Sequence, residues 1–169
     1  MNNYYLSKSL IHRTKSKSET GFTLVELIIV VFILGILSAM VLPNALKQAA
    51  KAREAEGKSN LGVLTRAQQT YHFENSTFAN SISSLLSNAN IQSRYFAFPN
   101  PTIASSSIVK HQAVSINPTI DMVRNYATGV YFNSGTFAVA VCESANVNVE
   151  VNAPDIISDP CTNGGDRIR

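Results

Sequence analysis

The chain has 169 residues, 45% of them hydrophobic and 15% charged, a length that predicts a single domain. Its net charge of +3 comes entirely from residues 1–21, which carry four basic residues against Glu19, while ten basic and ten acidic residues balance in the remainder. This distribution argues against a basic nucleic-acid-binding face, and we expect no direct nucleic-acid site.

Residues 22–42 form an almost uninterrupted apolar run. As a helix this run spans about 30 Å, enough to cross a membrane and longer than the apolar core of a secretory signal peptide. Two alternatives stay open: a signal peptide cleaved near Ser38–Met40 or Ala45, and a plain single-pass anchor. Because the basic residues precede the run, we predict a cytoplasmic N-terminus and an exported remainder.

One acidic residue, Glu26, interrupts the run. A carboxylate at the centre of a membrane helix costs about 2.5–3.5 kcal/mol, so such a residue usually has a function and a partner. No Lys or Arg occurs between Lys17 and Lys47, but a cut between Gly21 and Phe22 would create a free amine one turn away. The alternative is that Glu26 only reaches the lipid headgroups.

A basic leader ending in Gly21, then Phe22-Thr23-Leu24-Val25-Glu26 and an uncharged apolar stretch, resembles the N-terminal signal of type IV pilins and pseudopilins. The resemblance includes Gly35 and Pro43, extends through the following polar helix to about residue 80, and is strongest to cyanobacterial and G/H-type pilins. One departure is the acidic residue two positions before the leader glycine, where many leaders are basic. The resemblance holds despite it, because the family pattern depends on Gly21 and Glu26.

The resemblance implies that a prepilin peptidase cuts between Gly21 and Phe22 and N-methylates Phe22. Glu26 would then neutralise the terminal amine of a neighbouring subunit, and the stretch from Gly35 to Pro43 would lose helical hydrogen bonding on assembly. The implied partners are further copies of the chain, the peptidase, the inner-membrane assembly machinery and, before assembly, the lipid bilayer. The implied location is the inner membrane, followed by an extracellular pilus or a periplasmic pseudopilus.

Residues 43–74 continue the helix as an amphipathic half, with apolar or small residues at roughly helical spacing. Together with the apolar run this predicts one helix of about 50 residues, nearly 80 Å long. Gly57 and Gly62 weaken it by about 1 kcal/mol each relative to Ala. Its charged residues are read either as solvated or as contacts between subunits: Lys51, Arg53, Glu54 and Glu56.

Residues 75–169 change to a composition typical of loops and strands. A connecting loop contains a weak glycosylation match at Asn75-Ser76-Thr77 and a possible short helix near Leu85 and Leu86. Strands are predicted over residues 95–98, 108–116, 126–132 and 136–141, the last two joined by a turn at 133–135, with a further strand over 147–151. The predicted fold class is α+β: a type IV pilin fold whose long N-terminal helix packs on a roughly four-stranded antiparallel sheet.

Two cysteines, Cys142 and Cys161, bound a C-terminal loop of 18 residues. They would stay separate thiols in a reducing compartment, but export predicts a disulfide. Some pseudopilins bind Ca²⁺ near this region, and Asp155, Asp159 and Asp166 lie here. Scattered surface acids are the commoner explanation, so we predict neither a metal nor a cofactor.

The three histidines, His12, His72 and His111, lie in no pattern that suggests a triad or a zinc site, so we predict that the chain is not an enzyme. The expected division is a leader (1–21), a membrane and assembly half of the helix (22–42), an exported half (43–74) and a sheet region (75–169). The expected function is a type IV pilus subunit serving motility, adhesion or DNA uptake. The alternatives are a pseudopilin of a type II secretion system and an anchored binding domain that never polymerises.

Overall fold

The computed structural model describes residues 21–85 and 91–168. The chain divides into two compact units, Met1–Val41 and Leu42–Arg169. The elements in chain order are α1 (Leu24–Asn75), α2 (Ile82–Leu85), β1 (Phe96–Ala97), β2 (Ile103–Ala104), β3 (Ile108–Ser115), α3 (Pro118–Asp121), β4 (Tyr126–Asn133), β5 (Thr136–Glu143), the 3-10 turn η1 (Thr162–Gly164) and β6 (Asp166–Arg167). Short helix α2 lies in the predicted connecting loop and includes Leu85, while Leu86 lies outside the described residues.

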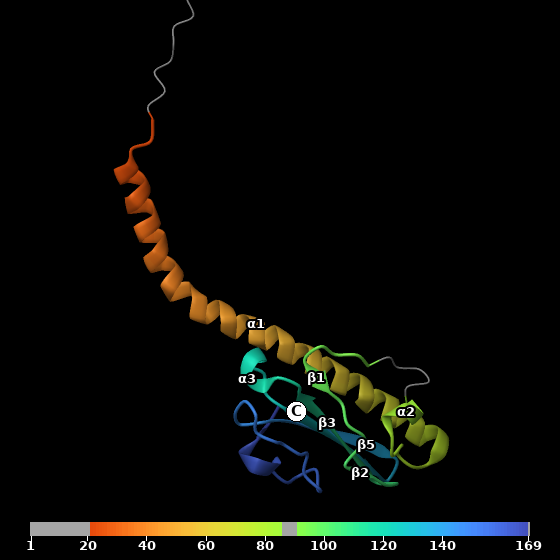
Figure 1. The fold of residues 1–169 in the computed structure, drawn as a ribbon. Coiled ribbons are helices and arrows are strands. Elements are labelled where there is room, and N and C mark those ends of the chain that lie inside the picture. The colour runs from red at the N-terminus through yellow and green to blue at the C-terminus, as the bar shows by residue number, and fades with distance from the viewer. Residues whose placement is uncertain (1–20, 86–90, 169) are drawn as a thin grey trace, which may run out of the picture. The chain divides into compact units, whose positions relative to one another are not determined.

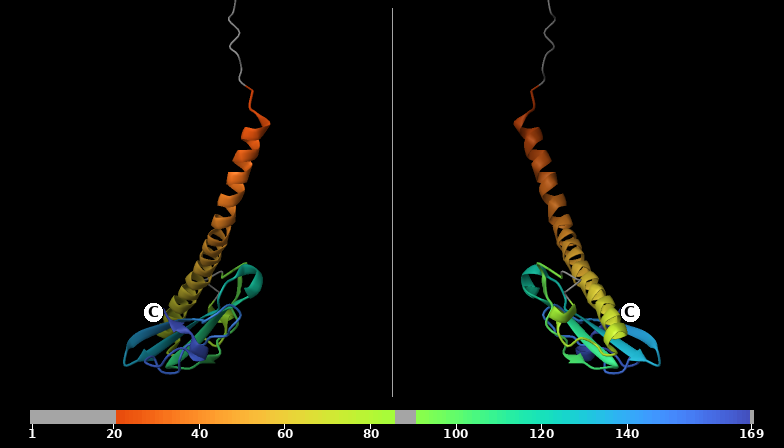
Figure 2. Two further views of the ribbon diagram at one scale, coloured as in Figure 1. Left: turned by 90° about the vertical axis from the view of Figure 1, so that its left-hand side faces the viewer. Right: turned by 90° about the vertical axis from the view of Figure 1, so that its right-hand side faces the viewer.

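Helix α1 is continuous over 52 residues, which confirms the predicted single helix. In the second unit its buried positions recur every three or four residues, the spacing of one helix face. Figures 1 and 2 show this part of α1 packed along the sheet. The buried residues of α1 are Ala50, Glu54, Gly57, Leu61, Leu64, Thr65, Gln68 and His72.

The sheet has six antiparallel strands rather than the predicted four, in the order β1-β3-β4-β5-β6, with β2 also paired to β3. The predicted strands correspond to β1, β3, β4 and β5. The strands that the sequence did not predict, β2 and β6, have two residues each, too few for an alternating pattern to show. Strands β4 and β5 form the predicted hairpin, and its turn residues Ser134 and Gly135 both have positive φ, as a two-residue hairpin loop requires.

The predicted strand over residues 147–151 is wrong. This segment is turn and irregular chain, and Asn148 has a φ of 64°, which interrupts an extended backbone. Two of its carbonyl groups bind side chains instead of a neighbouring strand: Val149 accepts from Asn125 at 2.8 Å and Val151 from Gln112 at 3.2 Å. Of the three alternating valines only Val151 is buried in a core cluster, so their alternation does not reflect strand pairing.

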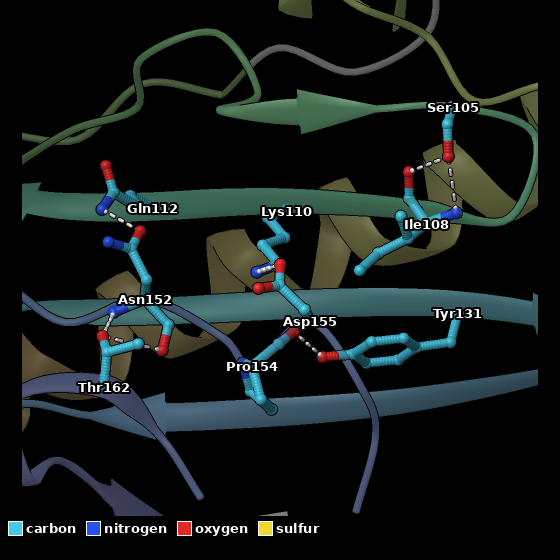
Figure 3. Close-up of polar contacts among 9 residues, drawn as sticks. All are labelled: Ser105, Ile108, Lys110, Gln112, Tyr131, Asn152, Pro154, Asp155 and Thr162. Atoms are coloured by element: carbon cyan, nitrogen blue, oxygen red, sulfur yellow. Dashed lines mark hydrogen bonds and ion pairs between the residues drawn. The ribbon is translucent and has the colours of Figure 1, made fainter. Parts of the chain in front are cut away.

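The C-terminal segment covers the sheet face opposite α1 (Figure 3). Lys110 Nζ lies 2.6 Å from Asp155, and the Gln112 side chain donates to Asn152 at 2.6 Å. The hydroxyl of Tyr131 donates to the carbonyl of Pro154 at 2.5 Å, and burial raises the pKa of Tyr131 to about 12. The sheet is consequently the middle of three layers, and central strand β4 is buried on both faces.

Two glycines allow these layers to approach closely. A Cβ on Gly57 would lie 2.8 Å from the ring of Phe96, so the helix reaches β1 only because this position is bare. A Cβ on Gly129 of β4 would lie 2.6 Å from the hydroxyl of Tyr131 and 3.0 Å from Ala153. Gly57 is thus a packing position, and this explains a residue that helix propensity alone disfavours.

An ion network joins α1 to the sheet near the start of β4. The buried carboxylate of Glu54 accepts hydrogen bonds from the backbone N–H of Arg124 at 3.1 Å and from its Nε at 3.3 Å. Arg124 also pairs with Glu143 at the end of β5, and Lys58 lies 3.7 Å from that carboxylate. Burial by itself lowers the pKa of Arg124, but the two carboxylates outweigh it and raise the pKa, so the guanidinium stays charged.

The neighbouring Arg53 is also used inside the unit. Its guanidinium donates to the carbonyl of Asp121 at 2.9 Å and lies over the ring of Tyr95, 5.2 Å from the centroid. Arg53 and Glu54 are therefore structural contacts and not simply solvated charges, whereas Lys51 is exposed.

A buried amide–imidazole contact holds the later turns of α1. The side-chain amide of Gln68 donates to the carbonyl of Ala79 and to Nε2 of His111, both at 2.9 Å, and accepts from the N–H of Ala79 at 2.9 Å. Since Nε2 is the acceptor, the imidazole proton sits on Nδ1, which has no hydrogen-bond partner among the described residues. Burial lowers the pKa of His111 to about 4.

We predict that His111 makes folding stability fall as the pH drops from 7 to 5. The unfolded chain binds a proton on this histidine near pH 6.5, whereas the folded chain does so only near pH 4. The contribution of neutral His111 to the free energy of unfolding is therefore complete above pH 6.5. About 2 kcal/mol of it is lost by pH 5, before most carboxylates titrate. Urea unfolding of the purified chain in detergent micelles measures this loss. A His111→Asn variant should be less stable at pH 7 but lose little more on acidification, and an equal loss in both proteins would contradict the prediction.

The predicted disulfide between Cys142 and Cys161 is present. Cys142 lies in β5, and the bridge packs with Ala127, Val151 and Ala153 in a small apolar cluster on the sheet face opposite α1. The bridge thus fastens the C-terminal segment over that face.

We expect reduction of this disulfide to lower the free energy of unfolding by about 3 kcal/mol, the loop-closure value for a bridge of this sequence separation. Urea unfolding with and without dithiothreitol measures the change. The Cys142→Ser/Cys161→Ser double variant is the matched control: it should show the lower stability and no response to reductant. Equal midpoints for the oxidised and reduced parent chain would refute the expectation.

Candidate assembly site

The apolar half of α1 presents hydrophobic side chains in every direction. In the first unit fifteen large hydrophobic side chains between Phe22 and Val41 are exposed, and the helix is long and apolar enough to cross a membrane. Covering these side chains is worth on the order of 30 kcal/mol, at about 2 kcal/mol each. A surface of this kind needs either lipid or other apolar helices around it.

The start of α1 is closed by a reciprocal capping box between Thr23 and Glu26. The Glu26 carboxylate accepts from the backbone N–H of Thr23 at 3.0 Å and from its hydroxyl at 2.7 Å. In return the N–H of Glu26 donates to the hydroxyl oxygen of Thr23 at 3.2 Å. These contacts satisfy two of the backbone donors that a helix N-terminus leaves free.

The capping box gives Glu26 a neutral partner that our sequence reasoning missed, because we searched only for cations. The Thr-x-x-Glu spacing at positions 23 and 26 was a sufficient signal for it. The hydrogen bonds orient the carboxylate but do not neutralise its charge. Gly21 and Phe22 precede the helix without regular secondary structure, and both are exposed, Phe22 to 73%.

Gly35 and Pro43 both lie within the continuous helix. A Cβ on Gly35 would meet no heavy atom within 4 Å among the described residues. Because this uncovered position has no side chain, another helix can approach the backbone closely there. Pro43 lacks a backbone N–H and thereby removes one hydrogen bond from the helix.

The acidic residues of the C-terminal loop do not converge. Asp155 pairs with Lys110, while Asp159 and Asp166 are exposed. In the part of the chain that the structure describes, no three His, Cys, Asp or Glu side chains are grouped so that they could hold a metal ion.

Two protein-family models match the chain. The model described as type IV pilin-like G and H matches residues 54–161, more than half of the chain, and the model of the prokaryotic N-terminal methylation motif matches residues 16–42. The first match includes most of the part of α1 that lies in the second unit and nearly all of the sheet, and the second match includes the capping box and the apolar half of α1.

Individual relatives include both pilus and secretion proteins. A type IV major pilin protein PilA of Myxococcus xanthus is 48% identical over 65 residues, which are 37% of this chain and 30% of that protein. A type II secretion system core protein G of Vibrio cholerae is 39% identical over 64 residues, 38% of this chain and 44% of that protein. A type IV wide pilus major component PilA4 of Thermus thermophilus is 31% identical over 71 residues, 42% of this chain and 54% of that protein. The chain thus spans less than two thirds of the length of each of these relatives.

We predict that Thr23→Val loosens the start of α1. Valine keeps the shape of threonine but loses the hydroxyl, at a cost of about 1 kcal/mol, so backbone amides in the first turn should exchange about fivefold faster in micelles. Thr23→Ser keeps the hydroxyl and should behave like the parent chain. Unchanged exchange in Thr23→Val would show that the hydroxyl does not stabilise the helix start.

Proposed function

Because the chain belongs to the type IV pilin-like G and H family, we propose that it is a structural subunit of a type IV pilus and has no enzymatic role. The exported unit is a folded body, and the helix half that precedes it is apolar in every direction. Such a helix is stable in a bilayer before assembly and in a bundle of identical helices afterwards. Polymerisation through this helix exchanges lipid contacts for protein contacts without exposing the apolar side chains to water.

The single observation that carries the proposal is the carboxylate of Glu26 at the head of this apolar helix, oriented by Thr23 but lacking a cation among the described residues. Cleavage between Gly21 and Phe22 supplies a positively charged amine on each subunit. The amine of one subunit then neutralises Glu26 of its neighbour, which offsets the cost of placing the charge among apolar helices. Thr23 is retained after this cut, so the capping box persists in the processed chain.

We assign the segments of the chain accordingly. Residues 1–21 are a cytoplasmic leader that a prepilin peptidase removes before methylating Phe22, and residues 22–42 anchor the subunit in the inner membrane. Gly35 provides close helix contact and Pro43 a weak point in helical hydrogen bonding during assembly. Residues 43–74 and 75–169 are exported, which agrees with a disulfide between Cys142 and Cys161.

The decisive experiment combines processing and assembly. Intact-mass analysis of the membrane-extracted chain should find a start at methylated Phe22. Glu26→Gln should be processed normally but reduce the fibres recovered from sheared cells at least tenfold, because its amide cannot neutralise the amine. Glu74→Gln, at the exposed far end of the same helix, is the control and should leave fibre yield unchanged.

Normal fibre yield from Glu26→Gln would remove the proposed mechanism. A chain that retains residues 1–21 in the membrane would point instead to an anchored domain that does not polymerise.

A pseudopilin of a type II secretion system is the second candidate, favoured by the similarity to the Vibrio cholerae core protein G. Both readings need the same cleavage and the same role for Glu26. They differ in where the polymer is found: a pilin at native expression is recovered in the sheared fraction, whereas a periplasmic pseudopilin stays with the cells.

A further inference from the structure

A pocket of about 450 Å³ lies at the end of the exported unit where α1 stops. It is formed by the last turn of α1, the β4–β5 hairpin and the loop between β2 and β3, which Figure 1 shows at the same end of the sheet. Its volume is typical of sites for small molecules. Along α1 it is about 45 Å from residue 42, which begins this unit.

One wall of this pocket is an aromatic platform formed by His72, Phe73 and Phe132. The ring of His72 lies 4.3 Å from that of Phe132 and 4.5 Å from that of Phe78. Phe73 is 74% exposed, yet it packs edge-on against Phe137 with the centroids 5.1 Å apart. The platform therefore offers an exposed ring, Phe73, that packs against the partly buried ring of Phe137.

The remaining residues that line the pocket are four serines and one asparagine: Ser76, Ser106, Ser107, Asn133 and Ser134. The loop that bears Ser106 and Ser107 is fixed by its carbonyl groups. His72 Nε2 donates to the Ser106 carbonyl at 2.8 Å, and the N–H of Phe132 donates to the Ser107 carbonyl at 2.8 Å. The backbone that carries the exposed Ser106 and Ser107 is thus held in place, so little ordering of this loop is required when a ligand binds. On the hairpin, the Ser134 hydroxyl donates to Oδ1 of Asn133 at 3.0 Å, and a ligand would replace this bond.

The chemistry of the lining narrows the ligand class. The eight described residues around the pocket include no Lys, Arg, Asp or Glu, so nothing there compensates a phosphate or a carboxylate. A wholly apolar partner would bury the serine hydroxyls without hydrogen bonds. A sugar ring can interact with both the aromatic platform and the serine and asparagine side chains. Its C–H groups pack on the negative face of an aromatic ring, and its hydroxyls form hydrogen bonds with serine and asparagine.

We propose that this pocket binds a neutral carbohydrate, with Phe73 stacking on the sugar ring and the serine–asparagine rim bonding its hydroxyls. The pocket belongs entirely to the exported unit, and the proposal does not depend on the filament function. It gives the exposed Phe73 a role that neither the fold nor the assembly helix requires.

The test is saturation-transfer difference NMR on the full chain in dodecylphosphocholine, a detergent without a sugar headgroup. The probes are glucose, galactose, N-acetylglucosamine, N-acetylgalactosamine and lactose, with methyl phosphate, whose methyl protons this experiment observes, as the charged comparison. At least one sugar should bind saturably and methyl phosphate should not. Phe73→Ala and Phe73→Leu should each raise Kd at least fivefold, whereas Phe73→Tyr keeps the ring and should stay within twofold of the parent.

Ile120→Ala is the matched control, because Ile120 is 77% exposed on α3, which Figure 1 shows away from the end of α1 that borders the pocket. It should leave Kd unchanged, which shows that loss of any exposed apolar side chain is not enough. Failure of all five sugars to saturate, or an unchanged Kd in Phe73→Ala, overturns the proposal. If Phe73→Ala leaves sugar affinity unchanged but lowers fibre yield, the surface is a contact between copies of the chain and the proposal is also wrong.

Discussion

Packing of one face of α1 on the sheet is the constraint on which the second unit, Leu42–Arg169, depends. This face carries polar residues among the apolar ones, and each of the polar residues described above has a specific partner on the sheet or its loops. Glu54 binds Arg124 near the start of β4, and Gln68 holds both Ala79 and His111. Apolar contacts alone would tolerate a slide of one helical turn, but these partners allow only one register.

The sheet is covered on both of its faces, and this accounts for the burial of its central strand. Strand β4 is buried on both faces because α1 lies on one side and the disulfide-bound C-terminal segment on the other. Lys110 and Gln112 alternate with His111 along β3, so neighbouring residues serve opposite layers. The C-terminal segment is therefore part of the core and not a loop appended to a two-layer fold.

The N-terminal half of α1 is not stabilised by packing on the sheet, because no part of the described chain covers it. Its side chains need an apolar environment that the monomer does not supply, and its single carboxylate needs a charge that the described residues do not supply either. The capping box with Thr23 meets the hydrogen-bonding requirement of Glu26 and leaves the electrostatic one open. The polymer of processed subunits that we propose would meet both needs.

Much of this protein could be derived from the sequence because its strongest patterns are local. The apolar run, the Gly21–Glu26 motif and the Asn133-Ser134-Gly135 turn each depend on adjacent residues, and they predict the helix, the family resemblance and the hairpin. The roles proposed for Gly21, Phe22, Glu26, Gly35 and Pro43 still rest on that resemblance, since a single chain does not display assembly.

Features that depend on contacts between residues far apart in the chain could be recognised only in the tertiary structure. The polar members of the buried helix face could not be recognised, because Glu54 and His72 look like surface residues until their partners are known. The valines of residues 147–151 alternate like a strand, yet their carbonyls bind side chains of Asn125 and Gln112. Two-residue strands and the pocket beside Phe73 likewise arise only when distant segments meet. Local patterns thus determined the long helix and the hairpin of this protein, and long-range hydrogen bonding determined how these elements pack and which surfaces they create.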